Sequence, residues 1–166
     1  MKTTAFFTQI LSWLTGSRLT VDNSVVRDLD LDRFLGSWYE VARFDHFFER
    51  GMSQTKANYV LRDDGNIDVI NTGIKNGKPK TAKGKAKLTD IPSLLRVSFF
   101  GPFYSDYRVM LVDADYRYML IGSGSDGYLW ILSRTPQLAD SDRTAILSEA
   151  KSRGYETDKL IWVKQN

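Results

Sequence analysis

The sequence contains no cysteine and a single histidine, His46. The absence of cysteine excludes disulfides, thiolate catalysis, thiolate metal sites and a lipid-modified cysteine in this chain. One histidine cannot build a multi-histidine metal site. We therefore expect neither a metal nor any other cofactor.

Long hydrophobic runs are also missing, since no apolar stretch approaches the ~20 residues that a membrane-spanning helix needs. A G-x-S-x-G motif, which positions the nucleophile of many serine hydrolases, does not occur either. The net charge of +3 is too small to indicate nucleic acid as a partner.

Aromatic residues are abundant, at 13% of 166 residues, and such side chains often line ligand pockets. The length suits one compact domain, which we place at residues 29–166, after an arm over residues 1–28. Apolar residues between Phe6 and Leu14 gather on one side of a predicted amphipathic helix. This helix is interpreted as a vestigial leader, as an element docked on the domain or a partner, or as an interfacial membrane anchor.

From Gly36 onward, short stretches with a two-residue hydrophobic period alternate with turn residues. Eight strands are predicted, at residues 38–44, 55–61, 67–72, 81–88, 94–100, 107–112, 117–122 and 128–133, with a loop at 101–106. A helix capped by Asp140 or Ser141 and ended by Gly154 follows, and then a short final strand. The pattern is typical of an all-β protein, either an up-and-down antiparallel barrel or a sandwich.

Period two also assigns the two faces of each strand. The predicted inner face includes the polar residues Glu40, Tyr59, Asn71 and Tyr128, whereas Arg43 is expected on the outer face. The other predicted inner residues are Trp38, Ala42, Phe44, Ala57, Leu61, Ile67, Val69, Gly84, Ala86, Leu88, Leu95, Val97, Phe99, Trp130 and Leu132. Small residues opposite aromatic ones favour a ligand cavity, although an eight-stranded barrel can equally be filled by side chains.

Three blocks resemble the lipocalin family: Gly36-x-Trp38 at the first strand, Asp113 to Tyr116 after the sixth, and Arg134 after the eighth. Their order and spacing on this pattern of elements make the resemblance specific, and it covers residues 29–165. The stretches YEVARFDHFFERG, VSFFGPFY and YLWILSRTP are most similar to bacterial lipocalins. That subgroup is related to apolipoprotein D and to the plant temperature-induced lipocalins.

The resemblance implies an eight-stranded calyx that is open at one end and binds a hydrophobic ligand. It also implies structural roles at the closed end for Gly36, Trp38, Asp113, Tyr116 and Arg134, with the arginine packed across the indole. The residues expected to contact the ligand are Glu40, Phe44, Tyr59, Val69, Asn71, Val97, Phe99, Tyr107, Tyr128 and Trp130. Bacterial lipocalins usually reach the outer membrane through a lipoprotein cysteine. Because this chain has none, the outer membrane, the periplasm and the cytoplasm all stay open.

His46, Phe47 and Phe48 fall in the first long loop, which we place at the mouth of the barrel. The phenylalanines are interpreted as an apolar lip that gates the ligand or touches a membrane or a second subunit, or as residues that pack the loop down. We expect no catalytic residue, because the sequence offers no credible acid–base pair with His46.

Six lysines between Lys75 and Lys87, with no acidic residue among them, are expected to form an outer basic face. Such a face is either only solvated or attracted to anionic lipid head groups. The aromatic residues at 99–107 are expected at the open end, as a pocket rim, as a homodimer contact or as a cover for the barrel side.

The sequence therefore predicts that the chain binds and carries a fatty acid, a lysophospholipid or a similar lipid, for storage or maintenance of membrane lipid. The partners expected are this ligand, a membrane surface and a second copy of the chain, and no nucleic acid. Two alternatives are an enzyme that acts on a bound lipophilic ligand and an interaction module whose barrel is filled.

Overall fold

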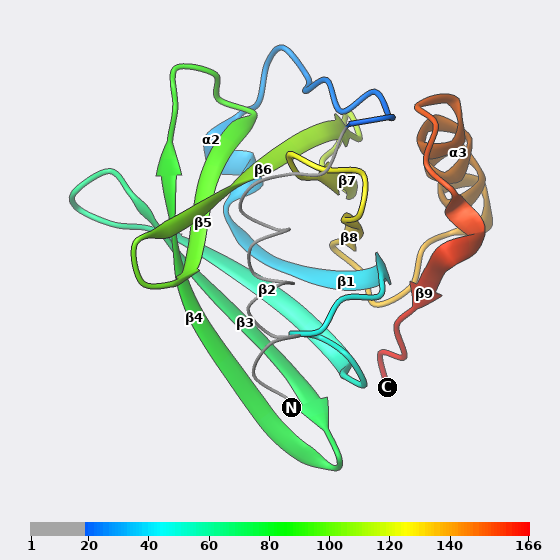
Figure 1. The fold of residues 1–166 in the computed structure, drawn as a ribbon, viewed down its shortest axis with the longest axis horizontal. Helices are drawn as coiled ribbons and strands as arrows, with labels where there is room; N and C mark the ends of the chain where they lie inside the picture. Colours follow the sequence, from blue (N-terminus) through cyan, green and yellow to red (C-terminus); the bar gives the residue numbers. More distant parts are fainter. Residues whose placement is uncertain (1–18) are drawn as a thin grey trace.

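The computed structural model describes residues 19–166, so the helix predicted within residues 6–14 lies outside the described part of the chain. Strands β1 and β2 pair with each other, and β1 also pairs with β8, which closes an antiparallel up-and-down barrel (Figure 1). The predicted fold is confirmed. The barrel strands are β1 (Gly36–Phe44), β2 (Ser53–Leu61), β3 (Ile67–Lys75), β4 (Lys78–Leu88), β5 (Leu94–Phe100), β6 (Phe103–Val112), β7 (Tyr118–Gly122) and β8 (Leu129–Ser133).

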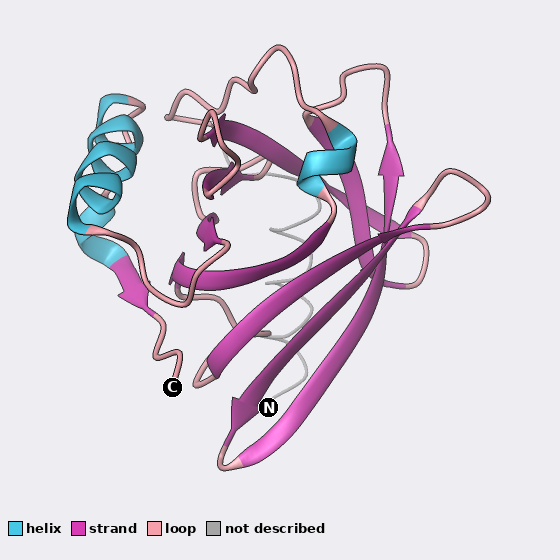
Figure 2. Cartoon of the chain, turned by 180° about the vertical axis from the view of Figure 1, so that it is seen from behind, coloured by secondary structure: helices cyan, strands magenta, loops and turns pink. Residues whose placement is uncertain are grey.

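The remaining elements lie at the ends and on the outside of the barrel. They are α2 (Leu31–Phe34), α3 (Asp140–Ser152), the 3-10 helix η1 (Thr157–Lys159) and β9 (Leu160–Trp162). Strand β9 pairs with the end of β1 outside the ring, and α3 stands beside the barrel (Figure 2).

The ends of α3 agree only in part with the sequence prediction. Neither Asp140 nor Ser141 caps the helix, because it begins at Asp140 and its N-cap is Ala139, which offers no side-chain hydrogen bond. At the other end, Gly154 adopts a φ of +96° and its amide donates to the Lys151 carbonyl, as expected for a glycine that stops a helix.

Two hydrophobic cores lie on opposite faces of the same sheet. The inner core fills the closed end of the barrel and includes Trp38, Phe34 and Leu95. The outer core lies between the sheet and α3, where Ile146 and Ala150 of the helix are fully buried. Because β1, β6, β7 and β8 are covered on both faces, their burial does not alternate as a half-buried strand would.

A β-bulge in β1 changes the facing of that strand. The register moves from Glu40 opposite Leu132 to Ala42 opposite Ile131, which leaves Val41 as the extra residue. Beyond the bulge, Ala42 and Phe44 belong to the outer core, and Arg43 faces inward. The predictions that Ala42 and Phe44 face the cavity and that Arg43 faces outward are therefore wrong.

Three further predictions differ from the structure. Leu61 and Leu88 were expected inside, but they are 46% and 40% exposed, because each is the last residue of its strand and nothing covers it. Residues 103–106, expected in a loop, form the start of β6, which pairs with β5 from Phe103 onward.

Within residues 19–166, no helix is long and apolar enough to cross a bilayer.

Candidate ligand-binding site

Trp38 forms the closed end of the barrel interior. Its side chain is fully buried, and its indole N–H donates to the Phe34 carbonyl at 2.8 Å. The Arg134 guanidinium lies 3.6 Å from the centre of the indole ring and donates to the Ser37 and Leu35 carbonyls at 2.8 and 2.9 Å. A cation–π contact and these hydrogen bonds therefore seal the floor and tie α2 to β1.

The turn at Asp113 to Tyr116 supports the same end. The Asp113 carboxylate accepts hydrogen bonds from the backbone amides of Asp115 and Arg117 at 3.2 Å, and the Arg117 side chain donates to it as well. These hydrogen bonds lower the pKa of Asp113. Tyr116 adopts a φ of +56°, and its hydroxyl accepts from the Asp30 amide at 2.7 Å. The turn thus fixes the N-cap of α2 beneath the floor.

A chamber of about 60 Å³ lies above the floor. Its residues come from every barrel strand except β4, and from the β1–β2 loop. The lining consists of Glu40, Phe48, Glu49, Ala57, Tyr59, Val69, Asn71, Val97, Phe99, Asp106, Tyr107, Ile121, Trp130 and Leu132. The chamber is therefore mainly apolar and aromatic, with a few polar groups.

Tyr59 and Tyr107 supply a pair of hydroxyl groups to the chamber. Their oxygens lie 2.8 Å apart, and the Tyr59 ring packs 4.7 Å from the Phe34 ring. Burial raises the pKa of both phenols, so both stay neutral. Because one hydroxyl donates to the other, the pair keeps a second hydrogen that can be donated to a ligand.

A larger cavity of about 460 Å³ forms the mouth of the barrel. It shares five lining residues with the chamber below: Glu40, Phe48, Glu49, Asn71 and Phe99. The residues that line only the mouth cavity are Met52, Thr55, Lys56, Thr72, Lys75, Lys80, Thr81, Ala82, Lys83 and Phe100. The mouth and the chamber thus meet at a junction with polar and aromatic walls.

A buried cluster of charged side chains stands at this junction. Arg43 is 2% exposed in its side chain, and it donates to the Glu40 carboxylate at 2.8 Å. Its other terminal nitrogen donates to the backbone carbonyls of Glu49 and Met52 at 2.8 and 3.0 Å. Arg43 therefore holds the β1–β2 loop against the barrel and neutralises Glu40 at the same time.

Glu49 is the second carboxyl group of the cluster. Burial, and then the negative charge of Glu40, raise the pKa of Glu49 well above its usual value. The nearest cationic atom, Nε of Arg43, is 3.7 Å from its Oε2. One arginine thus faces two carboxyl groups, and Glu49 keeps its proton to a higher pH than an exposed glutamate does.

His46 is in contact with Glu49, and its Nε2 lies 3.5 Å from the Glu49 carboxyl Oε2. Its ring packs against Phe48 at an interplanar angle of 40°, with centroids 3.9 Å apart, and neither ring nitrogen makes a hydrogen bond with a described residue. Burial, and then the positive charge of Arg43, lower the pKa of His46 to about 3. The imidazole is therefore neutral and serves as a packing group of the loop.

The lowered pKa of His46 predicts acid sensitivity. The folded protein resists protonation below the unfolded pKa of about 6.5, so stability is present above that pH and is lost as pH falls towards 3. Between pH 7.5 and pH 5, we expect this residue to cost about 2 kcal/mol of unfolding free energy. His46→Phe keeps an aromatic ring and should remove that loss, as measured by urea unfolding at both pH values. Equal pH dependence in the two proteins would contradict the assignment.

The structure brings most of the predicted ligand-contact residues together. Eight of them line the chamber: Glu40, Tyr59, Val69, Asn71, Val97, Phe99, Tyr107 and Trp130. Phe44 does not, because the bulge turns it outward against Tyr155, with ring centroids 6.2 Å apart. Tyr128 stacks on Trp130 at 5.8 Å and does not line the chamber or the mouth cavity.

Sequence reasoning missed several lining residues. Phe48 was considered as a lip, but it reaches the junction itself, and Glu49 and Asp106 were not considered. Glu49 comes from a loop without periodicity, so no facing could be assigned to it. Asp106 lies in the part of β6 that was expected to be a loop, and it is paired with Arg96 and with Arg108 at 3.0 Å.

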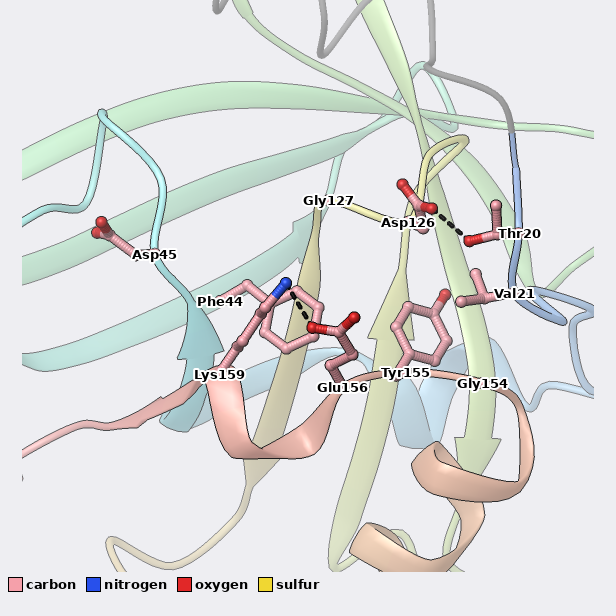
Figure 3. Close-up of a pocket in the computed structure, with 10 residues that line it drawn as sticks. All are labelled: Thr20, Val21, Phe44, Asp45, Asp126, Gly127, Gly154, Tyr155, Glu156 and Lys159. Carbon is pink, nitrogen blue, oxygen red and sulfur yellow. Dashed lines mark hydrogen bonds and ion pairs between the residues drawn. The ribbon is translucent and has the colours of Figure 1, made fainter.

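A second hollow of about 550 Å³ lies outside the barrel, beside Phe44 and Tyr155 (Figure 3). Charged residues stand along it, including Asp45, Asp126 and the ion-paired Glu156 and Lys159. This hollow shares no lining residue with the chamber or with the mouth cavity. Among residues 19–166, no group of three carboxylate or imidazole side chains could hold a metal ion.

The closed eight-stranded ring, the tryptophan floor and the interior cavity define a calyx-type barrel. The chain belongs to the lipocalin-like family, since the family model described as a lipocalin-like domain matches residues 29–165. It is 50% identical over 146 residues to the outer membrane lipoprotein Blc of Citrobacter freundii, covering 86% of this chain and 82% of that protein. The Vibrio cholerae protein of the same name is 42% identical over 168 residues, covering 97% and 98%.

A solved structure supports the fold independently. Lobster apocrustacyanin A1 superposes with a TM-score of 0.70 over 91% of this chain and 89% of its own, at 20% identity. The resemblance to bacterial lipocalins is therefore confirmed, both by the sequence relatives and by the arrangement of the strands.

Proposed function

We propose that the barrel binds and carries a single-chain lipid, such as a fatty acid, a lysophospholipid or a similar molecule. The observation that carries the proposal is the mouth cavity of about 460 Å³ that continues into an apolar chamber. This volume lies within the roughly 300–1,000 Å³ of small-molecule sites. The biological role we propose is storage or maintenance of membrane lipid.

Burial of an acyl chain supplies the affinity, at about 0.8 kcal/mol for each methylene removed from water. The chain enters through the mouth and lies against Phe99 and Trp130. Because the chamber itself is small, its deepest part becomes accessible when Phe48, which lines both cavities, moves aside. The polar end of the lipid is oriented by Glu40 and Asn71 at the junction.

Carriage fits the site better than catalysis. His46 is buried and has a pKa of about 3, so it is a weak base, and it stands behind Phe48 and Glu49. Glu40 is occupied by Arg43. The charged cluster therefore supports the loop, and the proposed function requires no bond to be made or broken in the ligand.

A filled barrel that serves only as an interaction module is the second candidate, and the small volume of the chamber favours it. Substitution at the junction separates the two. Asn71→Phe places a ring in the passage and removes a buried amide oxygen that has no hydrogen-bond partner, so the fold should tolerate it. Exclusion of about four methylenes from the interior should raise the Kd of a fluorescent fatty acid roughly 100-fold.

The matched control is Ile70→Phe, one residue away on the opposite face of β3. It should bind the probe as the unmodified protein does. If the unmodified protein takes up no probe, and native mass spectrometry of protein from its source finds no lipid, carriage is rejected in favour of the filled barrel. If both variants bind equally well, the ligand lies elsewhere.

We also propose that the protein works in the cell envelope. The proposal rests on relatives from two bacteria whose name is outer membrane lipoprotein Blc. The chain itself contains no cysteine. Fractionation of cells that express the tagged full chain tests the location, and recovery in the cytoplasm would contradict it.

A further inference from the structure

The lysines of β3 and β4 are divided between the two faces of their hairpin. In the register, Lys75 lies opposite Lys78, Lys80 opposite Gly73, and Ala82 opposite Asn71, which lines the barrel interior. Directly opposite residues share a face of the sheet, so Lys75, Lys78 and Lys80 lie on the same face as Asn71. They occupy the part of the hairpin that extends past the pairing of β4 with β5. The expectation of one outer basic face holds only for Lys83, Lys85 and Lys87, which alternate with these positions, and of these Lys83 also borders the mouth cavity.

The inner-face lysines stand on a hairpin tip that projects past its neighbours (Figures 1 and 2). Strand β4 pairs with β5 only from Lys85 to Leu88, so its first half has β3 on one side and, among residues 19–166, no strand on the other. Lys78 and Lys80 are exposed, and Lys75 and Lys80 also line the mouth cavity. The tip is therefore a basic part of the rim of the mouth.

Within the described residues, the charge of these lysines is not compensated by acidic side chains. Lys75 and Lys78 are directly opposite each other, an arrangement of like charges that destabilises a sheet. No acidic residue occurs between Val69 and Thr89, and within residues 19–166 these lysines form no ion pair. An anionic surface outside the molecule would supply the missing counter-charge.

An aromatic residue is exposed on the same end of the barrel. Phe103 follows the β5–β6 turn and is 51% exposed. Because adjacent strands are antiparallel, the β5–β6 turn and the β3–β4 turn lie at the same open end. An exposed aromatic side chain at the same end of the barrel as the lysines suits the interface of a bilayer, where rings sit at head-group level and ammonium groups meet phosphates.

We propose that the β3–β4 hairpin tip, formed by Lys75, Lys78 and Lys80, docks on an anionic lipid bilayer and turns the mouth of the barrel towards the head groups. This goes beyond the proposed carriage of lipid, since it assigns the surface at which the barrel is loaded or emptied. Each lysine near an anionic surface strengthens binding about fivefold, so three supply on the order of 100-fold. The attraction weakens with salt as the Debye length shortens.

The test compares two triple variants of the full chain that lose the same net charge. The first carries Lys75→Gln, Lys78→Gln and Lys80→Gln. The control replaces three lysines away from the hairpin tip, Lys87→Gln, Lys151→Gln and Lys159→Gln. Binding is measured by co-sedimentation with phosphatidylcholine vesicles that contain or lack phosphatidylglycerol, at low and high salt.

The hairpin variant should lose on the order of 100-fold in binding to the anionic vesicles, and the control should keep its binding. Equal losses in both variants, or no loss in either, would overturn the proposal. The fluorescent fatty acid is measured in parallel. If the hairpin variant keeps its vesicle binding and loses fatty acid affinity, the lysines hold the ligand and the docking surface is rejected. Lys78→Gln alone should show about a fivefold loss, which guards against a folding defect of the triple variant.

Discussion

Replacement of Trp38 by alanine should lower the free energy of unfolding by about 3–5 kcal/mol. The indole is completely buried and fills the closed end of the barrel, so its removal leaves a cavity between β1, β2 and α2. The variant also loses the hydrogen bond to the Phe34 carbonyl and the contact with Arg134. Urea unfolding followed by circular dichroism measures the change.

Trp162→Ala is the matched control, because Arg143 lies 3.6 Å over the Trp162 ring, the same distance as in the Arg134–Trp38 pair. Trp162 is only half-buried and lies outside the ring on β9. Its removal should therefore cost about 1 kcal/mol. If the two variants are equally destabilised, the stability comes from the arginine contact, and the floor of the barrel does not depend on burial of Trp38.

The sequence was sufficient for the ring of strands because hydrophobic period and turn residues are local properties of a chain. Tyr59, Val69 and Val97 were placed inside on that basis alone, and they line the chamber. The closed end was predictable for a different reason. Gly36-x-Trp38 and Arg134 lie far apart in the chain, and only the resemblance to a family brought them together.

The facing of the second half of β1 could not be predicted, because the bulge depends on how β1 pairs with β8 and not on the sequence of β1 alone. The sequence from Val41 to Phe44 has no glycine to mark it, and both faces of this strand are covered. Strict alternation therefore predicted that Phe44 faces inward and Arg43 outward, whereas the structure shows the reverse. With Arg43 misplaced, its pairing with Glu40 could not be predicted.

The buried cluster follows from that one extra residue. With the bulge, Glu40 and Arg43 come to the same side three residues apart, and their carboxylate–guanidinium distance is 2.8 Å. Glu49 lies beside this pair because the Arg43 side chain donates a hydrogen bond to the Glu49 backbone carbonyl and so holds the β1–β2 loop in place. The inward-facing Glu40 is thus paired by the residue that the bulge turns inward.

Arg43→Met should destabilise the protein by about 3–5 kcal/mol, because it leaves the buried Glu40 carboxylate without its counter-ion. The carbonyls of Glu49 and Met52 also lose their donor, so the β1–β2 loop should loosen at the mouth. Urea unfolding measures the stability, and hydrogen exchange of residues 45–52 reports on the loop. Arg50→Met is the matched control, since Arg50 and its partner Asp45 are exposed, and it should cost less than about 1 kcal/mol.

A double variant separates the two effects of Arg43. Adding Glu40→Leu to Arg43→Met removes the unpaired charge, and an apolar pair of similar size is often as stable as a buried ion pair. Most of the lost stability should return, while the loop exchange stays fast because the two carbonyls still lack a donor. If the double variant is as unstable as the single one, Arg43 stabilises the barrel through the loop and not through Glu40. If the loop becomes protected again, the two backbone hydrogen bonds do not hold it.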